Sequence, residues 1–352
     1  MSIPEQRPVG ETRQPSATTP TPANAPAHPA GLTLLTVIST EEEFDWSAPF
    51  GRENTSVSAI QAVRHGQAVF DSCGVRPVYV VDYPVASNPQ SAATLREILE
   101  SGRCEIGAHL HPWVTPPFEE DVNPRNSFPG NLPHALERRK LIEVVHALER
   151  AFGIVPRAYQ AGRYGVGPAT SDLLEELGFE VDFSSSPGFD FSREGGPDFS
   201  QLRSVTHWSG RKRSVLSVPM SGAIVGAIPT GRVAVHRLAS SELLRWTGFG
   251  SVVARLRLAE RVRLSPEGFD DAALARLVQH LLDDGVRVFA FGLHSPSFMP
   301  GCTPYVTNAA ELARFLDRIR RFYDFFLGDL GGRHVTPSEL HLEMRATSRH
   351  SP

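Results

Sequence analysis

Apolar and polar positions alternate along this chain in a pattern that is typical of repeated strand–helix units. A short apolar run at 32–38 predicts a buried strand, and amphipathic segments of helical period separate it from further runs of the same kind. The segments that predict strands lie at 32–38, 77–81, 104–108, 157–161, 179–183, 215–220 and 286–291. Those that predict helices lie at 57–73, 91–101, 134–152, 170–177, 270–284 and 308–326.

Strands that alternate with helices predict parallel βαβ units, because parallel neighbours need a crossover connection that a helix usually supplies. A chain of 352 residues is about the right length for a single α/β barrel with insertions. We therefore expect residues 31–345 to form one distorted (β/α) barrel domain. Residues 1–30 are dense in Pro, Ala and Thr and have almost nothing to bury, which predicts a disordered N-terminal tail.

Composition narrows the classes of function. The formal net charge of −4 lacks the basic excess of nucleic-acid-binding proteins, so we expect no nucleic-acid partner. No apolar run approaches the roughly 18 residues of a membrane span, and no secretory signal is recognisable. The three cysteines, Cys73, Cys104 and Cys302, form no Cys-x-x-Cys and predict neither disulfides nor a thiolate zinc site. We expect a cytoplasmic protein without a membrane partner; its oligomeric state is left open.

Two histidines, His109 and His111, stand one residue apart where an apolar segment runs into a Gly/Pro loop. Side chains at i and i+2 of an extended segment point to the same side, so the two imidazoles can converge on one metal ion. The alternative is a pair of loop histidines with surface hydrogen bonds. An acidic ligand at another strand end would favour the metal.

Such acids follow the first strand directly, at Glu41, Glu42, Glu43 and Asp45. A solvated acidic loop is the plain alternative. Clustered carboxylates at the end of a buried strand repel one another unless a cation lies among them. A divalent metal held by one carboxylate and two imidazoles leaves positions open for water and substrate. A second carboxylate could then act as general base, an arrangement that suits hydrolysis of an amide or ester.

Two further strand ends carry polar candidates. Arg163, in a Gly-flanked turn, could orient the base through a charge-assisted hydrogen bond, or it could simply occupy a turn. His294 follows another apolar run and could act as general acid for the leaving group, or it could be a hydrogen-bonded histidine at the edge of the core. In a parallel barrel these residues would gather at one end, since all strands end there.

The order of these motifs resembles the NodB-homology polysaccharide deacetylases. The motifs are a strand that ends in acids, Glu-Ile-Gly-x-His, an Arg-Tyr-Gly turn, Asp-x-Ser and Leu-His. The stretches Thr-Glu-Glu-Glu-Phe-Asp-Trp and Gly-Ala-His-Leu-His-Pro-Trp look most like the WalW-type branch, and the similarity covers approximately residues 32–330.

The resemblance implies a distorted (β/α) barrel that removes N-acetyl groups from a polysaccharide or amino sugar with a divalent metal, often zinc. It places the general base at Glu41, the metal ligands at Glu42, His109 and His111, and the catalytic acid at His294. It also implies that Arg163 orients the base, and that Asp182 assists His294 or simply ends its strand.

The sequence departs from the family pattern at several places. Glutamates replace the usual aspartates, and one residue rather than several separates the histidines. Gln160 stands where the Arg turn often begins with Arg, and Ser39 stands where related branches can place Asp. These departures leave two alternatives to the deacetylase open. One is a catalytically weak glycan-binding protein on the same barrel, and the other is a metal hydrolase of another small amide or ester.

Overall fold

The computed structural model describes residues 31–45, 48–226, 235 and 259–349. The predicted disordered tail at 1–30 lies outside these residues. The main sheet has the strand order β10-β1-β2-β3-β4-β5-β7-β6, with β11 paired to β1. Its strands are β1 (Thr33–Thr40), β2 (Val78–Val81), β3 (Glu105–Leu110), β4 (Ala158–Ala161), β5 (Val181–Asp182), β6 (His207–Ser209), β7 (Val215–Ser217), β10 (Val288–His294) and β11 (Arg333–His334).

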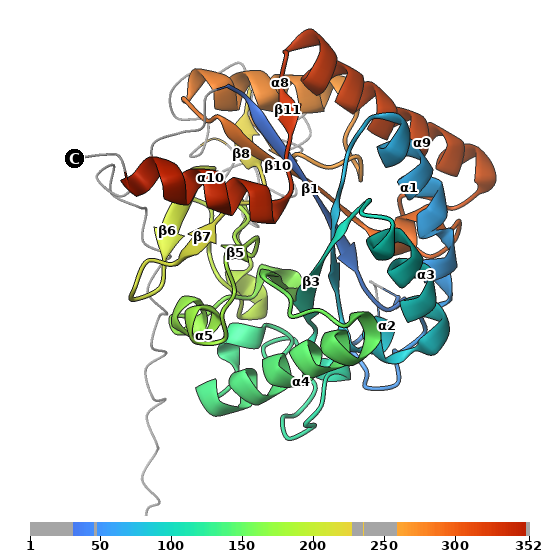
Figure 1. Ribbon diagram of the computed structural model, residues 1–352, viewed down its shortest axis with the longest axis vertical. Coiled ribbons are helices and arrows are strands. Elements are labelled where there is room, and N and C mark those ends of the chain that lie inside the picture. The colour runs from blue at the N-terminus through green and yellow to red at the C-terminus, as the bar shows by residue number, and fades with distance from the viewer. Residues whose placement is uncertain (1–30, 46–47, 227–234, 236–258, 350–352) are drawn as a thin grey trace, which may run out of the picture.

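The sheet is curled into an open, distorted barrel whose helices lie on the outside (Figure 1). All pairings in it are parallel except that of β6 with β7. A second sheet of two strands, β8 (Gly222–Val225) and β9 (Glu260–Arg263), stands between its two edges. Ser221 N donates to Ala290 O and Gly292 N to Leu264 O, which ties this segment to β10. The predicted fold class, a distorted (β/α) barrel, is confirmed.

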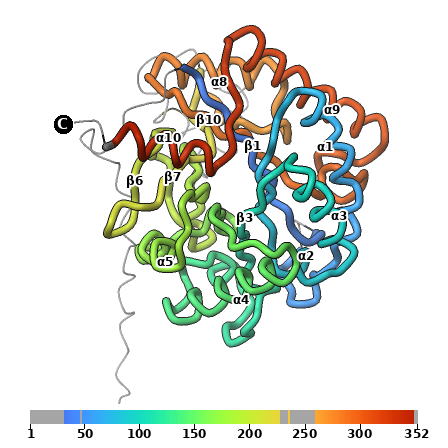
Figure 2. Tube along the Cα trace, in the orientation of Figure 1, coloured from blue at the N-terminus to red at the C-terminus, as the bar shows by residue number. Residues whose placement is uncertain are grey.

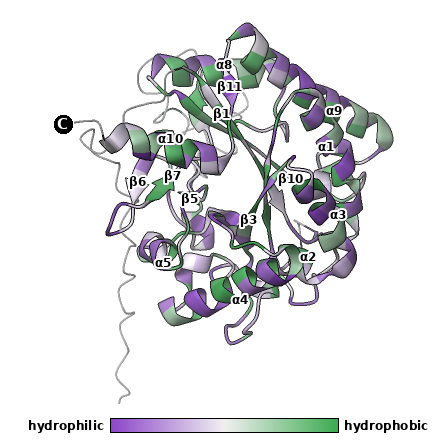
Figure 3. Ribbon diagram, viewed as in Figure 1, coloured by the Kyte–Doolittle hydropathy of each residue, from purple (hydrophilic) through white to green (hydrophobic). Residues whose placement is uncertain are grey.

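From α1 to α9 the helices follow the strands around the barrel in chain order, whereas α10, red in Figure 2, lies beside the yellow segments β6 and β7. Their polar sides face outward and their apolar sides face the strands (Figure 3). The α-helices within the described residues are α1 (Val63–Ser72), α2 (Tyr83–Ser87), α3 (Pro89–Glu100), α4 (His134–Phe152), α5 (Thr170–Glu176), α8 (Asp271–Asp283), α9 (Ala309–Tyr323) and α10 (Pro337–Arg349).

Local sequence sets several helix ends. The side chains of Asn88, Asp270 and Asn308 accept hydrogen bonds from backbone N–H groups in the first turns of α3, α8 and α9. Helix α4 ends at Gly153, whose φ of 68° is the left-handed conformation that glycine adopts readily. The predicted helix at 57–73 is divided: a 3₁₀ turn, Ser58–Ala62, precedes α1.

Strand β1 is buried on both faces, which explains why it reads as an unbroken apolar run. Leu34 and Ile38 pack toward the outer helices, and Leu35 and Val37 belong to the core inside the barrel. Helix α10 contributes to that inner core and follows β11, which pairs with the start of β1. The barrel is thus packed at the amino ends of its strands, and its cavity lies at the carboxyl ends. None of the described helices is long and apolar enough to cross a membrane.

Candidate active site

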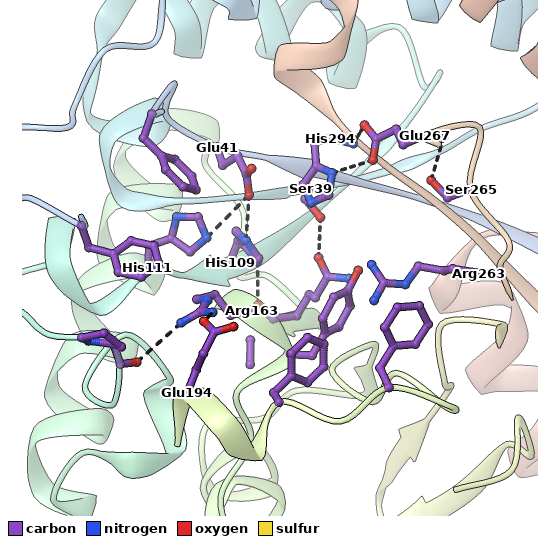
Figure 4. A pocket seen from close by; sticks show the side chains of 18 of the residues that line it. Ser39, Glu41, His109, His111, Arg163, Glu194, Arg263, Ser265, Glu267 and His294 are labelled. Atoms are coloured by element: carbon purple, nitrogen blue, oxygen red, sulfur yellow. Dashed lines mark hydrogen bonds and ion pairs between the residues drawn. The ribbon is translucent and has the colours of Figure 1, made fainter. Parts of the chain in front are cut away.

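A cavity of about 760 Å³ opens at the carboxyl ends of the strands (Figure 4). Two sides of it carry most of the ionisable groups. The imidazole wall consists of Glu41, His109 and His111, which follow or end β1 and β3. The cation wall consists of Arg263, Glu267 and His294, which come from β9, the segment after it, and the end of β10.

His109 lies near the end of β3, opposite Gln160 of β4 in the sheet register. Its Nδ1 is 2.8 Å from the backbone carbonyl of Gln160, and a carbonyl can only accept. The proton is therefore on Nδ1, and the lone pair of Nε2 faces the cavity. Burial is the main cause that lowers the pKa of this imidazole, and the neighbouring His111 lowers it further, so the ring is neutral near pH 7.

His111 is held on three sides. Its Nδ1 is 2.8 Å from Glu42 Oε2, and its ring stacks on Trp113 with centroids 4.3 Å apart. Gly162 packs against the ring, since a Cβ at that position would approach His111 Cδ2 to 2.4 Å. Burial lowers the pKa of His111 despite the nearby carboxylates. Its Nε2 therefore presents a lone pair to the cavity, as His109 does.

The two Nε2 atoms converge on Glu41. Glu41 Oε2 lies 3.3 Å from His109 Nε2 and 3.6 Å from His111 Nε2, and the carboxylate is only 4% exposed. Burial acts to raise the pKa of Glu41, but interactions with the surrounding histidines, the charge of His294 first, outweigh it and hold the pKa below its ordinary value. Glu41 is therefore a carboxylate anion that faces the Nε2 lone pairs of two neutral imidazoles.

Glu42 lies on the other side of His111, away from the cavity. Its backbone N–H donates to Asp82 Oδ2 over 2.9 Å, and Asp82 Oδ1 caps α2 through the N–H of Val85. Burial, and then the charge of Glu41, raise the pKa of Glu42 to about 7. Burial and the neighbouring Glu42 raise the pKa of Asp82 well above its usual range. The pair holds a proton near neutral pH, while Glu42 accepts from His111 and fixes the orientation of that ring.

The structure separates the roles expected of Glu41 and Glu42. Glu41 was expected as the base and Glu42 as the ligand that joins both histidines. It is the Glu41 carboxylate that faces both Nε2 atoms, whereas Glu42 reaches only the Nδ1 side of His111. The position of Glu42 is fixed from behind, because its backbone N–H donates to Asp82 Oδ2 while its carboxylate lies 2.8 Å from His111 Nδ1.

His294 ends β10 beside Ser39 of β1. Its Nδ1 lies 2.7 Å from Glu267 Oε2, and its backbone N–H donates to Glu267 Oε1 over 3.0 Å. Burial acts to lower the pKa of His294, but the carboxylates of Glu267 and Glu41 outweigh it and raise the pKa to about 9. The imidazole is thus protonated at neutral pH, which suits a proton donor.

The carboxylate that contacts His294 is Glu267, whereas Asp182 was expected either to assist His294 or simply to end its strand. Asp182 ends β5 and accepts hydrogen bonds from the backbone and side chain of Ser184. Burial raises its pKa to about 6. Its observed contacts are those of a carboxylate that ends a strand. Glu267 had no signal in the sequence, since it lies in an irregular segment after β9.

Arg163 lines the cavity, but its guanidinium is engaged by groups other than the predicted base. It donates to Ser127 Oγ over 2.6 Å, pairs with Glu194, and lies over the ring of Phe128 with 4.2 Å to the centroid. The φ of Arg163 is 55°, in the left-handed region that non-glycine residues rarely adopt. This backbone conformation places the side chain in the lining of the cavity. No contact in the described part of the chain joins Arg163 to Glu41 or Glu42, so the expected orienting role is not seen.

Ser39 and Gln160, the two departures from the family pattern, meet in the cavity. Ser39 Oγ donates to Gln160 Oε1 over 2.7 Å. A neutral hydrogen-bonded pair therefore stands where related branches can place an acid and an arginine. The rest of the lining is largely aromatic and includes Phe44, Phe50, Tyr164, Phe189, Phe191 and Tyr305.

The donor set of the imidazole wall fits a divalent metal. It offers two neutral imidazole nitrogens and one carboxylate oxygen, all buried and within 4.8 Å of one another. Ligands about 2.1 Å from a tetrahedral ion lie roughly 3.4 Å apart, close to the observed separations of Glu41 Oε2 from the two Nε2 atoms. A second set, Glu42, Asp82 and His111, is also buried. In that second set, both Asp82 oxygens already accept hydrogen bonds from backbone N–H groups. The set of Glu41, His109 and His111 is therefore the better candidate for a metal site.

Comparisons with known proteins give the fold. No protein family and no curated protein matches the chain. Among solved structures, a protein described as a polysaccharide deacetylase from Mycobacterium smegmatis superposes with a TM-score of 0.53 and 18% identity, over 94% of this chain and 96% of that one. This likeness shows a shared fold.

Two weaker likenesses have TM-scores below 0.5. PuuE allantoinase matches at 0.49 with 16% identity, over 93% of this chain and 95% of that one. A protein described as a polysaccharide deacetylase from Pseudomonas aeruginosa PAO1 matches at 0.47 with 15% identity, over 91% and 92%. The WalW-type branch stays a prediction.

Proposed function

We propose that this protein is a metal-dependent hydrolase of non-peptide carbon–nitrogen bonds that removes the acetyl group from an N-acetylated amino sugar. The observation that carries the proposal is the convergence of Glu41 Oε2 with the Nε2 atoms of His109 and His111, at 3.3 and 3.6 Å. A protonated histidine, His294, lines the same cavity.

In this proposal Glu41, His109 and His111 hold the metal, so Glu41 takes the ligand role first expected of Glu42. Two imidazoles and a carboxylate form a donor set that zinc favours. A metal bound there supplies Lewis acidity toward water and toward the carbonyl oxygen of the substrate. Glu42 acts behind His111 as an orienting carboxylate.

His294 donates a proton to the amine nitrogen as the amide bond breaks. An amine is a poor leaving group unless it is protonated, and the raised pKa of His294 keeps the proton available at neutral pH. Glu267 fixes the ring through Nδ1, so Nε2 is the nitrogen that transfers the proton in this proposal. The aromatic lining suits the apolar faces of a sugar ring, and the cavity volume is within the ~300–1,000 Å³ of small-molecule sites.

The test is acetate release from N-acetylhexosamine oligomers by the full-length protein with Zn²⁺. A His109→Ala/His111→Ala variant should lose zinc and at least about 10³-fold of the activity, because Lewis-acid stabilisation of several kcal/mol is removed. The matched control is His65→Ala/His146→Ala, which removes two exposed histidines from α1 and α4. Equal turnover by the wild type and the His109/His111 variant would contradict the metal mechanism.

A second candidate is a glycan-binding protein with weak catalysis. One observation favours it: the carboxylates among the described residues that line the cavity are Glu41, Glu194 and Glu267, and each already faces a basic partner. None is left over to act as a general base toward water. Zinc well below one equivalent per chain after metal loading, together with intact sugar binding, would support this candidate.

Ser39→Asp sharpens the choice between the two candidates. It restores an acid in the cavity beside His294. A rise in acetate release of roughly 10²-fold or more would show that only a base was lacking. An unchanged rate in a zinc-loaded variant would show that the wild-type cavity already supplies the proton acceptor.

A further inference from the structure

We propose that Arg263 binds an anionic group of the substrate, so that the amino sugar acted on carries a carboxylate or a phosphate. This inference rests on the proposed function for the reaction, but the binding of the anion is a separate property of the cavity. It makes Arg263 a specificity-determining residue.

Arg263 ends β9 and reaches into the cavity from the side opposite His111 (Figure 4). Its guanidinium lies over two aromatic rings, with 4.1 Å to the centroid of Phe189 and 4.5 Å to that of Tyr164. It also donates to Ser186 Oγ over 2.9 Å. Stacking and this hydrogen bond hold the planar group in one orientation before any ligand arrives, which reduces the entropy lost on binding.

The charge of Arg263 is not neutralised by any acid within the described part of the chain. Arg163, the other arginine of the cavity, pairs with Glu194, whereas no ion pair joins Arg263 to an acid of residues 31–45, 48–226 or 259–349. Its Nε–H is buried and has no acceptor among the described residues. A guanidinium has five N–H donors and matches carboxylate or phosphate oxygens in pairs, so the missing partner is an anionic oxygen.

A second cation stands on the same wall. His294 carries a proton near neutral pH, and the charge of Arg263 acts against that proton. Glu267 lies 2.7 Å from His294 Nδ1 and balances the charge of that imidazole, so the charge on this wall that is left for a ligand is that of Arg263. The anion would then lie near the proton donor, within the same sugar unit as the amide or the next one along. A neutral polymer offers no such group.

The cavity volume agrees with a compact ligand. Its volume of about 760 Å³ lies in the ~300–1,000 Å³ range of small-molecule sites. The substrate class is therefore an N-acetylated amino sugar that bears a carboxylate or a phosphate ester, as a monosaccharide or short oligomer. Both anions offer the same oxygen geometry to a guanidinium.

The experiment measures binding by calorimetry and acetate release by the full-length, zinc-supplied protein. The ligands are N-acetylglucosamine, its 6-phosphate and N-acetylmuramic acid, which are neutral, phosphorylated and carboxylated. We expect at least one anionic sugar to bind roughly 10–100-fold more tightly than the neutral one, as a charge-assisted pair does. The arm that binds more tightly identifies the anion.

The variants are Arg263→Gln, Arg263→Lys and the matched control Arg261→Gln. Arg261 lies two residues away on the same strand and also stacks on Phe189, at 4.4 Å, but it is exposed and does not line the cavity. Arg263→Gln should abolish the preference for anions and Arg263→Lys should keep part of it. Arg261→Gln should leave it unchanged. If Arg263→Gln does not fold, the anion preference of the wild type and its reduction in Arg263→Lys still test the proposal.

Equal binding of neutral and anionic sugars, or no binding of either anionic sugar, would overturn the proposal. So would a preference that survives in Arg263→Gln, since the metal would then be the anion's partner. An Arg263-dependent preference without acetate release would support this inference and contradict the proposed reaction. Acetate release without any preference for anionic sugars would support the proposed reaction and contradict this inference.

Discussion

The imidazole wall joins Glu41, directly after β1, to two histidines that stand one residue apart at the end of β3. The cation wall joins the segment that holds Arg263 and Glu267 to His294 at the end of β10, and no compact motif in the sequence marks it. His109 and His111 converge because two residues of one extended strand share a face. Arg263, Glu267 and His294 meet only because the segment around β9 lies against β10. One wall is therefore visible as a motif, and the other is a product of the tertiary fold. The two walls can be tested independently.

The largest expected effect is the loss of activity when His294 of the cation wall is replaced. His294→Gln should lower kcat about 10²–10⁴-fold, because the general acid is removed while the donor set of the imidazole wall is intact. Zinc content, measured on the purified variant, should stay at the wild-type level. Loss of zinc together with activity would show that the two walls are not separable.

Gly162→Ala should disturb the imidazole wall through packing. The new Cβ would lie 2.4 Å from His111 Cδ2 and 2.5 Å from the carbonyl of Leu110, so the ring or the strand must shift. We expect a loss of about 1–3 kcal/mol in the free energy of unfolding, measured by denaturant titration. Gly328→Ala is the control, because a Cβ there meets nothing within 4 Å. Equal stability of both variants would mean that the His111 ring can move to accept the added methyl group without cost.

Glu42→Gln tests the support behind His111. The substitution keeps the shape of the side chain and removes the charge that accepts from Nδ1, so the affinity for Zn²⁺ should fall about 10–100-fold. Competition with a chromophoric chelator measures this. Glu43→Gln is the matched control, because Glu43 instead accepts from Ser56 and Ser58 outside the cavity. If both variants bind zinc equally, Glu42 does not orient the ligand.

The smallest effect at neutral pH is expected from Glu267→Gln. In the wild type the proton of His294 is lost as the pH rises through about 9, so activity should fall on that alkaline side. Without the Glu267 carboxylate the protonated imidazole is less stable, and the fall should move roughly 1–3 pH units lower. The pH profile of kcat measures the shift. An unmoved alkaline limb would exclude His294 as the group that titrates.

Much of the barrel could be read from the sequence. β1, β3 and α4 were predicted within about two residues, because long apolar runs and amphipathic periods report burial directly. The short strands β6, β8 and β9 were not predicted, since three or four residues carry too little pattern. Strand β10 runs further than expected and carries His294 at its last position.

The candidate site divides in the same way. The sequence singled out Glu41, His109, His111, Arg163 and His294, and the structure brings all five to the lining of one cavity. It could not reveal which carboxylate faces the histidines, because that depends on the direction of each side chain after β1 ends. It could not reveal Glu267, Asp82 or the partner of Arg163 either, because each comes from a distant segment.

By itself, therefore, the sequence determined the alternation of strands and helices and the His-x-His pair. Both are local: periodicity and i, i+2 geometry need no information from elsewhere in the chain. Only the tertiary structure decided that Glu41 faces both imidazoles, that Glu42 supports His111 from behind, and that Glu267 holds His294. Those contacts depend on how parallel strands from remote parts of the chain are brought into register, and register is set by the packing of the whole barrel.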